Sequence, residues 1–275
     1  MTLESVAEFD PVTDELGLPT PGSDIVGDDH RLSAWAATVT GERLEALRTE
    51  GLEGRELKDA GDALGHRILM QLLATYRPDD AVLSEEGKDD KARLQSNRVW
   101  IIDPLDGTRE YSEPPRDDWA IHVALWRDGD LVAGAVAQPG MSTTFSTAEP
   151  PVVPKRTSTK PRIAVSRTRP PEFVSSLAQA INAELVPMGS AGAKVISVAR
   201  DVTDIYVHAG GQYEWDSAAP VVVARAAGLH TSRADGKPLA YNQENVWLPD
   251  LLVCRPELAD PVSAFVRDYW AQHGQ

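Results

Sequence analysis

The residues best suited to chemistry lie in the segment 100–108, where an apolar run ends in two aspartates. Residues 99–102 have the length and the β-branched and aromatic composition of a buried strand, which we expect to end at Asp103. Pro104 fixes its own φ and favours extended backbone at the residue before it, so the chain has to turn there. The carboxylates of Asp103 and Asp106 should therefore lie together at the mouth of the strand, where they can hold cations.

The turn that follows is suited to an anion. Gly107 can adopt a φ that other residues avoid and lets a ligand approach the backbone, and Thr108 adds a hydroxyl group and a further N–H. Two other acidic stretches fit the same chemistry, because Glu85-Glu86 follows an apolar pair and Asp216 opens an apolar helix. Clusters of carboxylates suit Mg²⁺, which binds carboxylate, water and substrate phosphate. The sequence thus predicts a magnesium site that acts on phosphate.

Each of these acidic residues also has a purely structural interpretation. Asp103 and Asp106 could serve as turn formers, because Asp-Pro and Asp-Gly are common turn sequences. Glu85 and Glu86 could belong to a solvated acidic loop, and Asp216 could cap the helix that follows it. Capping and metal binding can coexist at Asp216.

Three of these segments together resemble the signature motifs of the inositol monophosphatase superfamily. Within it, the chain is most similar to CysQ-type 3'-phosphoadenosine 5'-phosphate phosphatases. The resemblance covers most of the chain, from about residue 57 to the C-terminal helix. It implies a layered αβαβα fold of the α+β or α/β class and a lithium-sensitive, Mg²⁺-dependent phosphatase. The three superfamily motifs are Glu-Glu at 85–86, Asp-Pro-Leu-Asp-Gly-Thr at 103–108 and Trp-Asp-Ser-Ala-Ala at 215–219. The similarity to the CysQ type includes two further segments, Ser-Arg-Thr-Arg-Pro-Pro at 166–171 and Gly-Ser-Ala-Gly-Ala-Lys at 189–194.

The resemblance implies two Mg²⁺ ions in each active site, and whether a third joins them during turnover stays open. It assigns one ion to Glu85, Asp103 and the carbonyl group of Leu105. It assigns the other ion to Asp103, Asp106 and Asp216, so that Asp103 bridges the two.

The resemblance also implies how the reaction proceeds. Thr108, oriented by Asp62, would position the attacking water beside the metal ligand Glu85, and the N–H groups of Gly107 and Thr108 would hold the phosphoryl group. Taken on its own, Asp62 looks like an ordinary charge on a helix surface. Many members have Thr-Asp where this chain has Gly61-Asp62. The implied reaction is hydrolysis of a phosphate monoester by direct in-line attack of water.

The implied substrate is adenosine 3',5'-bisphosphate, or its 5'-phosphosulfate, from which the 3'-phosphate is removed to give AMP in sulfate assimilation. Arg169 stands where relatives carry a His and keeps the phosphate-binding chemistry, whereas His208 stands near a family Arg and weakens it at neutral pH. Ala209 occupies the spacing at which inositol monophosphatases carry an acidic residue, which counts against inositol phosphate. The substrate-binding residues that the resemblance implies are Ser166, Arg169, Ser190, Lys194 and His208.

Two other functions stay open. A broader phosphatase acting on inositol monophosphate or fructose 1,6-bisphosphate would share every metal ligand and differ in the pocket. A non-catalytic sensor of nucleotide phosphates would keep the fold but has no need of a water-activating pair of metals. His66 and His122 lie in apolar patterns, so we expect them to be packed rather than catalytic.

The composition limits the partners. The chain has 275 residues, 42% of them hydrophobic, which is enough for a sizeable core. A formal net charge of -15 would repel nucleic acid, and no segment approaches the ~18 apolar residues of a membrane span. The acidic N-terminus does not resemble a secretory signal, and the single Cys254 permits a reducing compartment. We therefore expect a cytoplasmic enzyme with a small nucleotide bisphosphate as partner. Dimers are common among relatives, so a homodimer stays open, and the sequence itself does not determine the oligomeric state.

The elements that must position these residues fall into two halves. Residues 1–27, rich in Pro, Gly and acidic residues, predict a flexible leader. Residues 28–150 predict an α+β half, in which two helices cover a largely antiparallel sheet with a hairpin around Asp128-Gly129. Residues 151–161 are rich in Pro and predict a linker. Residues 162–275 alternate strands and helices, which indicates an α/β half that completes the active site.

Overall fold

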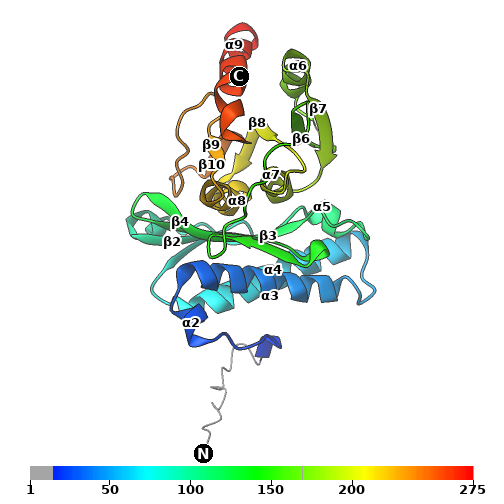
Figure 1. The fold of residues 1–275 in the computed structure, drawn as a ribbon. Coiled ribbons are helices and arrows are strands. Elements are labelled where there is room, and N and C mark those ends of the chain that lie inside the picture. The colour runs from blue at the N-terminus through cyan, green and yellow to red at the C-terminus, as the bar shows by residue number, and fades with distance from the viewer. Residues whose placement is uncertain (1–14, 169, 275) are drawn as a thin grey trace, which may run out of the picture.

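The computed structural model describes residues 15–168 and 170–274, which form alternating layers of helices and sheets. A pair of helices, a five-stranded sheet, a second pair of helices, a second five-stranded sheet and a last pair of helices follow one another through the molecule (Figure 1). This is the αβαβα arrangement that the motifs implied, so the predicted fold class is confirmed.

The first sheet is built from the N-terminal half. Its strands lie in chain order, with the first pair parallel and the other pairs antiparallel. The alternating apolar residues on either side of Asp128-Gly129 form the expected hairpin. The strands are β1 (Ala81–Ser84), β2 (Arg98–Asp106), β3 (Ala120–Arg127), β4 (Asp130–Gln138) and β5 (Thr143–Ser146).

Two long helices, α3 (Asp29–Leu47) and α4 (Gly54–Tyr76), cover the outer face of this sheet (Figure 1). Asp28 caps α3 as the sequence indicates, because its carboxylate accepts hydrogen bonds from the N–H groups of His30 and Arg31. A Cβ at Gly41 would lie 2.4 Å from the side chain of Pro139. Glycine is a poor helix former, but at position 41 it lets α3 lie close to the sheet.

The second sheet is mixed, with the strand order β7-β6-β8-β10-β9. Two helices lie between the sheets and two others cover the outer face of the second sheet (Figure 1). The strands are β6 (Arg162–Ser166), β7 (Glu184–Met188), β8 (Ile205–Tyr213), β9 (His230–Ser232) and β10 (Trp247–Cys254). The inner helices are α7 (Ala191–Ala199) and α8 (Glu214–Ala226), and the outer ones are α6 (Glu172–Ala180) and α9 (Ala259–His273). The short helices are α2 (Ser23–Val26), α5 (Thr108–Tyr111), η1 (Lys91–Gln95), η2 (Pro139–Met141) and η3 (Pro256–Leu258).

The central helix layer ties the two halves together. Residues 217–224 of α8 are all buried, which accounts for a helix that is apolar on every side. This helix packs on β2, β3 and β4 of the first sheet and on strands of the second. The two halves therefore share a continuous apolar cluster. Cys254 is fully buried in β10, as its apolar neighbours predict.

The predicted leader lies partly outside the described residues, which begin at residue 15. In the described part, Leu16 and Leu18 are buried against the cluster formed by α3, α4 and the first sheet. Residues 151–157 of the predicted linker contain no helix or strand, and Val152 there is 90% exposed. No helix of the described residues has the length and apolar composition needed to cross a membrane.

Candidate active site

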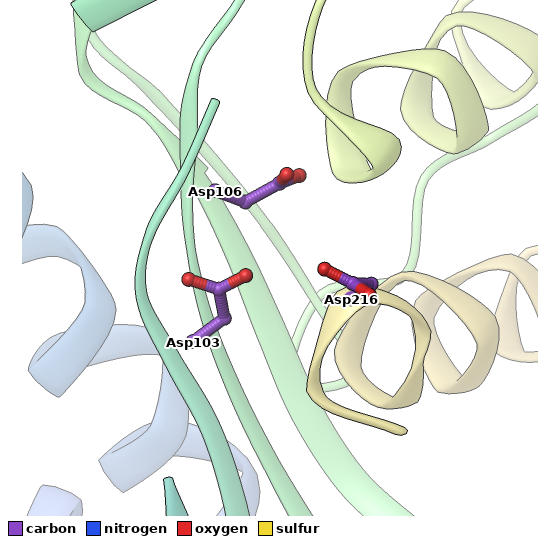
Figure 2. A group of neighbouring side chains, drawn as sticks. All are labelled: Asp103, Asp106 and Asp216. Atoms are coloured by element: carbon purple, nitrogen blue, oxygen red, sulfur yellow. The ribbon is translucent and has the colours of Figure 1, made fainter. Parts of the chain in front are cut away.

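Three aspartates converge where the first sheet meets the central helices. Asp103 and Asp106 come from the end of β2, and Asp216 comes from the first turn of α8. Each offers a carboxylate oxygen within 4.8 Å of the other two (Figure 2). Asp103 and Asp106 are buried and Asp216 is half-buried. Three carboxylates that lie this close together and are largely shielded from water need a cation to compensate their charge.

The course of β2 explains how Asp103 and Asp106 face the same space. The strand was expected to end at Asp103, but it continues to Asp106, and its pairing with β3 is irregular between these two residues. In a regular strand, residues three positions apart point to opposite faces of the sheet. The irregularity, which also accommodates the missing N–H of Pro104, turns Asp106 toward the side of Asp103.

Asp103 has the strongest signature of a metal ligand. Its Oδ1 accepts a hydrogen bond from the N–H of Leu105 at 3.0 Å, whereas its Oδ2 is buried and has no hydrogen-bond partner among the described residues. Burial, together with the carboxylates of Glu85 and Asp106, raises the pKa of Asp103 well above its usual value. A buried carboxylate oxygen without a donor is costly unless a cation binds it.

Asp106 is held at the N-terminus of α7. Its carboxylate accepts hydrogen bonds from the Ser190 hydroxyl at 2.5 Å and from the N–H groups of Ala191 and Gly192 at 3.1 and 2.7 Å. Nε2 of His122 lies 3.2 Å from its Oδ2. Burial would raise the pKa of Asp106, but His122 and these donors lower it to about 2. Asp106 is therefore ionised across the physiological pH range.

Asp216 both supports its helix and faces the site. Its Oδ2 accepts a hydrogen bond from the N–H of Tyr213 at 2.6 Å, at the start of α8. Burial and the nearby Asp106 carboxylate raise the pKa of Asp216 to about 7. Asp216 was expected to cap a helix that follows it, but α8 begins at Glu214 and Tyr213 is its N-cap, so Asp216 stabilises the helix start from within the first turn. The residue also offers an oxygen to the three-aspartate group.

Glu85 lies beside Asp103. It directly follows β1, and its N–H donates to the carbonyl group of Ile102 at 3.3 Å, which continues the pairing with β2. The residue as a whole is exposed, but its carboxyl group is close enough to that of Asp103 for each to affect the pKa of the other. Partial burial of this carboxyl group and the charge of Asp106 raise the pKa of Glu85 to about 7.

Thr108 and Asp62 meet, as the motifs implied, at the junction of α5 and α4. Oγ1 of Thr108 lies 3.5 Å from Oδ1 of Asp62 and 3.2 Å from the carbonyl oxygen of Leu105. Burial, and then the charge of Glu86, raises the pKa of Asp62 to about 6. Gly107 has a φ of 86°, and a Cβ there would lie 3.1 Å from the side chain of Ser190. The turn therefore requires glycine both for its backbone and for space.

A cavity of about 430 Å³ opens beside Asp216, between α7, β8 and the start of β10. It brings together Ser166, Lys194 and His208 of the expected substrate-binding residues. Ser190 is buried on the Asp106 side and does not line the cavity, and Arg169 lies outside the described residues. The other lining residues are Pro171, Ala191, Tyr206, Val207, Ala209, Gly210, Gly211, Gln212, Tyr213 and Trp247.

The two expected cations in the cavity are engaged with the protein backbone. Nζ of Lys194 donates to the carbonyl oxygens of Gly189 and Ser190 at 3.0 and 2.5 Å, and burial lowers the pKa of this ammonium group. Nε2 of His208 lies 2.9 Å from the carbonyl oxygen of Gly211, and burial lowers the pKa of the imidazole. His208 is therefore neutral at pH 7 and holds the part of β8 at Gly210-Gly211 where its pairing with β10 is irregular.

His122 is the neighbour of the site that sequence reasoning missed. It is fully buried, in agreement with its apolar surroundings, but it contacts Asp106 as well. The one signal is its register, since the antiparallel pairing of β2 with β3 places it directly opposite Asp103.

Comparison with known proteins defines the class of this chain, which belongs to the inositol monophosphatase family: the model of that family matches residues 35–264. A 3'-phosphoadenosine 5'-phosphate phosphatase from Mycobacterium leprae is 46% identical over 256 residues, which cover 88% of this chain and 94% of that protein. A protein of the same name from Mycobacterium bovis is 50% identical over 226 residues, covering 78% and 83%. The crystal structure of inositol monophosphatase II from Staphylococcus aureus has a TM-score of 0.73 at 22% identity, covering 87% of this chain and 95% of that one, and shares the fold.

Proposed function

We propose that this protein is a Mg²⁺-dependent phosphatase that removes the 3'-phosphate of adenosine 3',5'-bisphosphate, or of its 5'-phosphosulfate, to give phosphate and the 5'-nucleotide. The observation that carries the proposal is the buried, unpartnered Oδ2 of Asp103 within a group of three aspartates beside a cavity of about 430 Å³. The names of the mycobacterial relatives support the choice of substrate.

The donor set fits a hard divalent cation. Every candidate ligand is an oxygen atom, which favours Mg²⁺ over metals that prefer nitrogen or sulfur. When bound, two or three Mg²⁺ ions would supply charge neutralisation at the phosphate oxygens and a lowered pKa for the attacking water. The residues that would hold them are Glu85, Asp103, Asp106 and Asp216 through their carboxylates and Leu105 through its carbonyl group.

The protein's own groups then orient the reactants. Above pH 6, Asp62 is mostly a carboxylate, because its pKa is about 6. The hydroxyl group of Thr108 would donate to Asp62, since the other acceptor within reach, the Leu105 carbonyl oxygen at 3.2 Å, is a proposed metal ligand. This bond directs a lone pair of the Thr108 oxygen toward the attacking water, which can donate to it. The N–H groups of Gly107 and Thr108 hold the phosphoryl group. Water attacks phosphorus in line with the bond to the 3'-oxygen, and that bond breaks as the new one forms. A proton of the attacking water is lost to solvent or stays on the phosphate, and the 3'-oxygen takes a proton from solvent and leaves as the 3'-hydroxyl of the 5'-nucleotide.

The cavity provides for the nucleoside and the 5'-phosphate. Its volume is in the range that binds small-molecule ligands. Tyr213 and Trp247 at its edge are 43% and 44% exposed, so their rings are available to stack on a base. Ser166, Lys194 and His208, with Arg169 near Ser166 in the sequence, are the proposed polar contacts to the substrate. Ser190, which was expected among them, donates its hydroxyl proton to Asp106 instead.

Phosphate release tests the proposal when adenosine 3',5'-bisphosphate, inositol 1-phosphate and fructose 1,6-bisphosphate are compared at saturating Mg²⁺, with and without lithium. We expect the nucleotide to be preferred by at least about 100-fold in kcat/KM, which corresponds to about 2.7 kcal/mol of transition-state binding. Comparable values would make the protein a broad phosphatase. No release from any substrate would favour the sensor.

Three further expectations stay predictions. A role in sulfate assimilation and a cytoplasmic location follow from the proposed substrate. A homodimer would be tested by light scattering of the purified full chain.

A further inference from the structure

His122 lies close to both segments that carry the three-aspartate group, the end of β2 and the start of α8. It lies on β3, fully buried, where the sheet places it opposite Asp103 of β2. Its Nδ1 is 3.1 Å from the carbonyl oxygen of Trp215, the residue before Asp216. Its Nε2 is 3.2 Å from Oδ2 of Asp106, and its Nδ1 is 4.0 Å from Oδ2 of Asp103.

The fold makes room for this ring at a point where a side chain would exclude it. Gly192 lies in the first turn of α7, and a Cβ there would be 2.1 Å from Nε2 of His122. The N–H of Gly192 donates to the same oxygen of Asp106 that His122 faces, at 2.7 Å. The imidazole is therefore wedged between β2, the start of α7 and the start of α8.

We propose that His122 is a positioning residue for the metal site, which sets the separation between the β2 aspartates and Asp216 by donating from Nδ1 to the Trp215 carbonyl group while the other end of the ring packs against Asp106. The Trp215 carbonyl group is a pure acceptor, so Nδ1 carries the proton, and Nε2, which has no hydrogen-bond partner among the described residues, faces Oδ2 of Asp106 at the other end of the ring. The length of the ring fixes how far the end of β2 lies from the first turn of α8. Residues that contact the metal ligands, and not the metal itself, typically contribute about 10–100-fold to metal affinity.

This inference rests on the metal site of the proposed function. The test is calorimetric titration of Mn²⁺ and Mg²⁺ into the metal-free full chain, for the wild type and for His122→Asn, which keeps a polar group but cannot span both partners. We expect the dissociation constant to rise at least tenfold, with the Mg²⁺ concentration for half-maximal turnover rising in parallel. At saturating Mg²⁺ the KM for adenosine 3',5'-bisphosphate should stay within about threefold of the wild type, because the ring does not face the cavity.

Val123→Ala is the matched control. Val123 is the next residue of β3, fully buried in the outer apolar cluster, and contacts none of the aspartates in the hydrogen-bond or ion-pair network. The Val123→Ala substitution should lower the unfolding temperature and leave metal affinity unchanged. A purely structural role for His122 would produce the same pattern.

The outcomes separate the inference from the proposed function. If the wild type binds neither metal, the proposed function is wrong. If the wild type binds metal and His122→Asn binds it within threefold, the positioning role alone is wrong. If His122→Asn does not fold, Gly192→Ala decides, because its Cβ displaces the ring: a tenfold loss of affinity supports the inference and unchanged affinity overturns it.

Discussion

Asp106 and Asp216 offer carboxylate oxygens within 4.8 Å of one another, although Asp106 ends a strand of the first sheet and Asp216 begins a helix that packs beneath the second. The candidate site therefore lies in the seam between the two halves of the chain. Neither half contains it alone, and any change that shifts α8 against β2 should alter metal binding before it alters the fold.

Replacing Asp103 should abolish most activity. Asp103→Asn keeps the shape of the side chain but removes the charge of the ligand that bridges the proposed ions, so we expect less than a tenth of the wild-type kcat at saturating Mg²⁺. A tenfold loss corresponds to about 1.4 kcal/mol. Asp268→Asn, an exposed change on α9, is the control and should leave kcat unaltered. An Asp103→Asn variant that keeps more than a tenth of the wild-type kcat would argue against a bridging role for Asp103.

The acidic cluster should make the metal-free protein less stable at high pH. The pKa of Asp216 is raised to about 7 in the folded state, so the folded protein binds more protons than the unfolded chain between about pH 4 and 7. The stability present at low pH is therefore lost as the pH rises through 7. Glu85, with a pKa of about 7, acts in the same direction.

Asp216→Asn isolates this effect, since it keeps an acceptor for the Tyr213 N–H but cannot ionise. In EDTA at pH 8 we expect the variant to unfold at least about 2 °C above the wild type, and at pH 5 the difference should shrink. Mg²⁺ at pH 8 should reverse the order by stabilising the wild type. Equal unfolding temperatures at pH 8 in EDTA would show that Asp216 carries no raised pKa.

Replacement of Asp62 should lower kcat more than it weakens metal binding. Asp62→Asn weakens the acceptor that orients Thr108, so kcat should fall by at least tenfold while the Mg²⁺ concentration for half-maximal rate stays within about threefold. Asp59→Asn changes an exposed carboxylate on the same helix and serves as the control. A parallel rise in the Mg²⁺ requirement would mean that Asp62 acts through the ions instead.

Trp247 should matter for nucleotides alone. Its ring is 44% exposed at the edge of the cavity and lies edge-on to Tyr213, with centroids 5.5 Å apart. Trp247→Ala should raise the KM for adenosine 3',5'-bisphosphate about tenfold or more, because base stacking contributes about 1–3 kcal/mol. Turnover of inositol 1-phosphate, which has no base, is the internal control. An equal loss with both substrates would place the effect in folding.

The features that a short stretch of sequence determines could be predicted from the sequence. The alternation around Asp128-Gly129 predicted the β3–β4 hairpin, and Asp28 predicted the start of α3. The motif residues Asp103, Asp106 and Asp216 were expected together and lie together, because their types and spacing reflect a shared chemical requirement. Their roles as metal ligands stay predictions.

Features that depend on long-range packing had no such signal. The continuation of β2 beyond Pro104 depends on an irregular pairing with β3, which local propensity does not encode. Leu16 and Leu18 are buried, but two apolar residues in a segment rich in Pro and Gly show no period. The contacts of Lys194 and His208 with backbone carbonyl groups likewise arise from how α7 and β8 meet.

The proposed removal of the 3'-phosphate is tested most directly by ³¹P NMR of the wild-type enzyme during turnover of adenosine 3',5'-bisphosphate in Mg²⁺. The Asp103→Asn variant is measured in parallel. We predict that the 3'-phosphate signal is replaced by inorganic phosphate while the 5'-phosphate signal of AMP persists, and that the variant converts the substrate at less than a tenth of the rate. Loss of the 5'-phosphate instead, or no conversion by the wild type, would contradict the account.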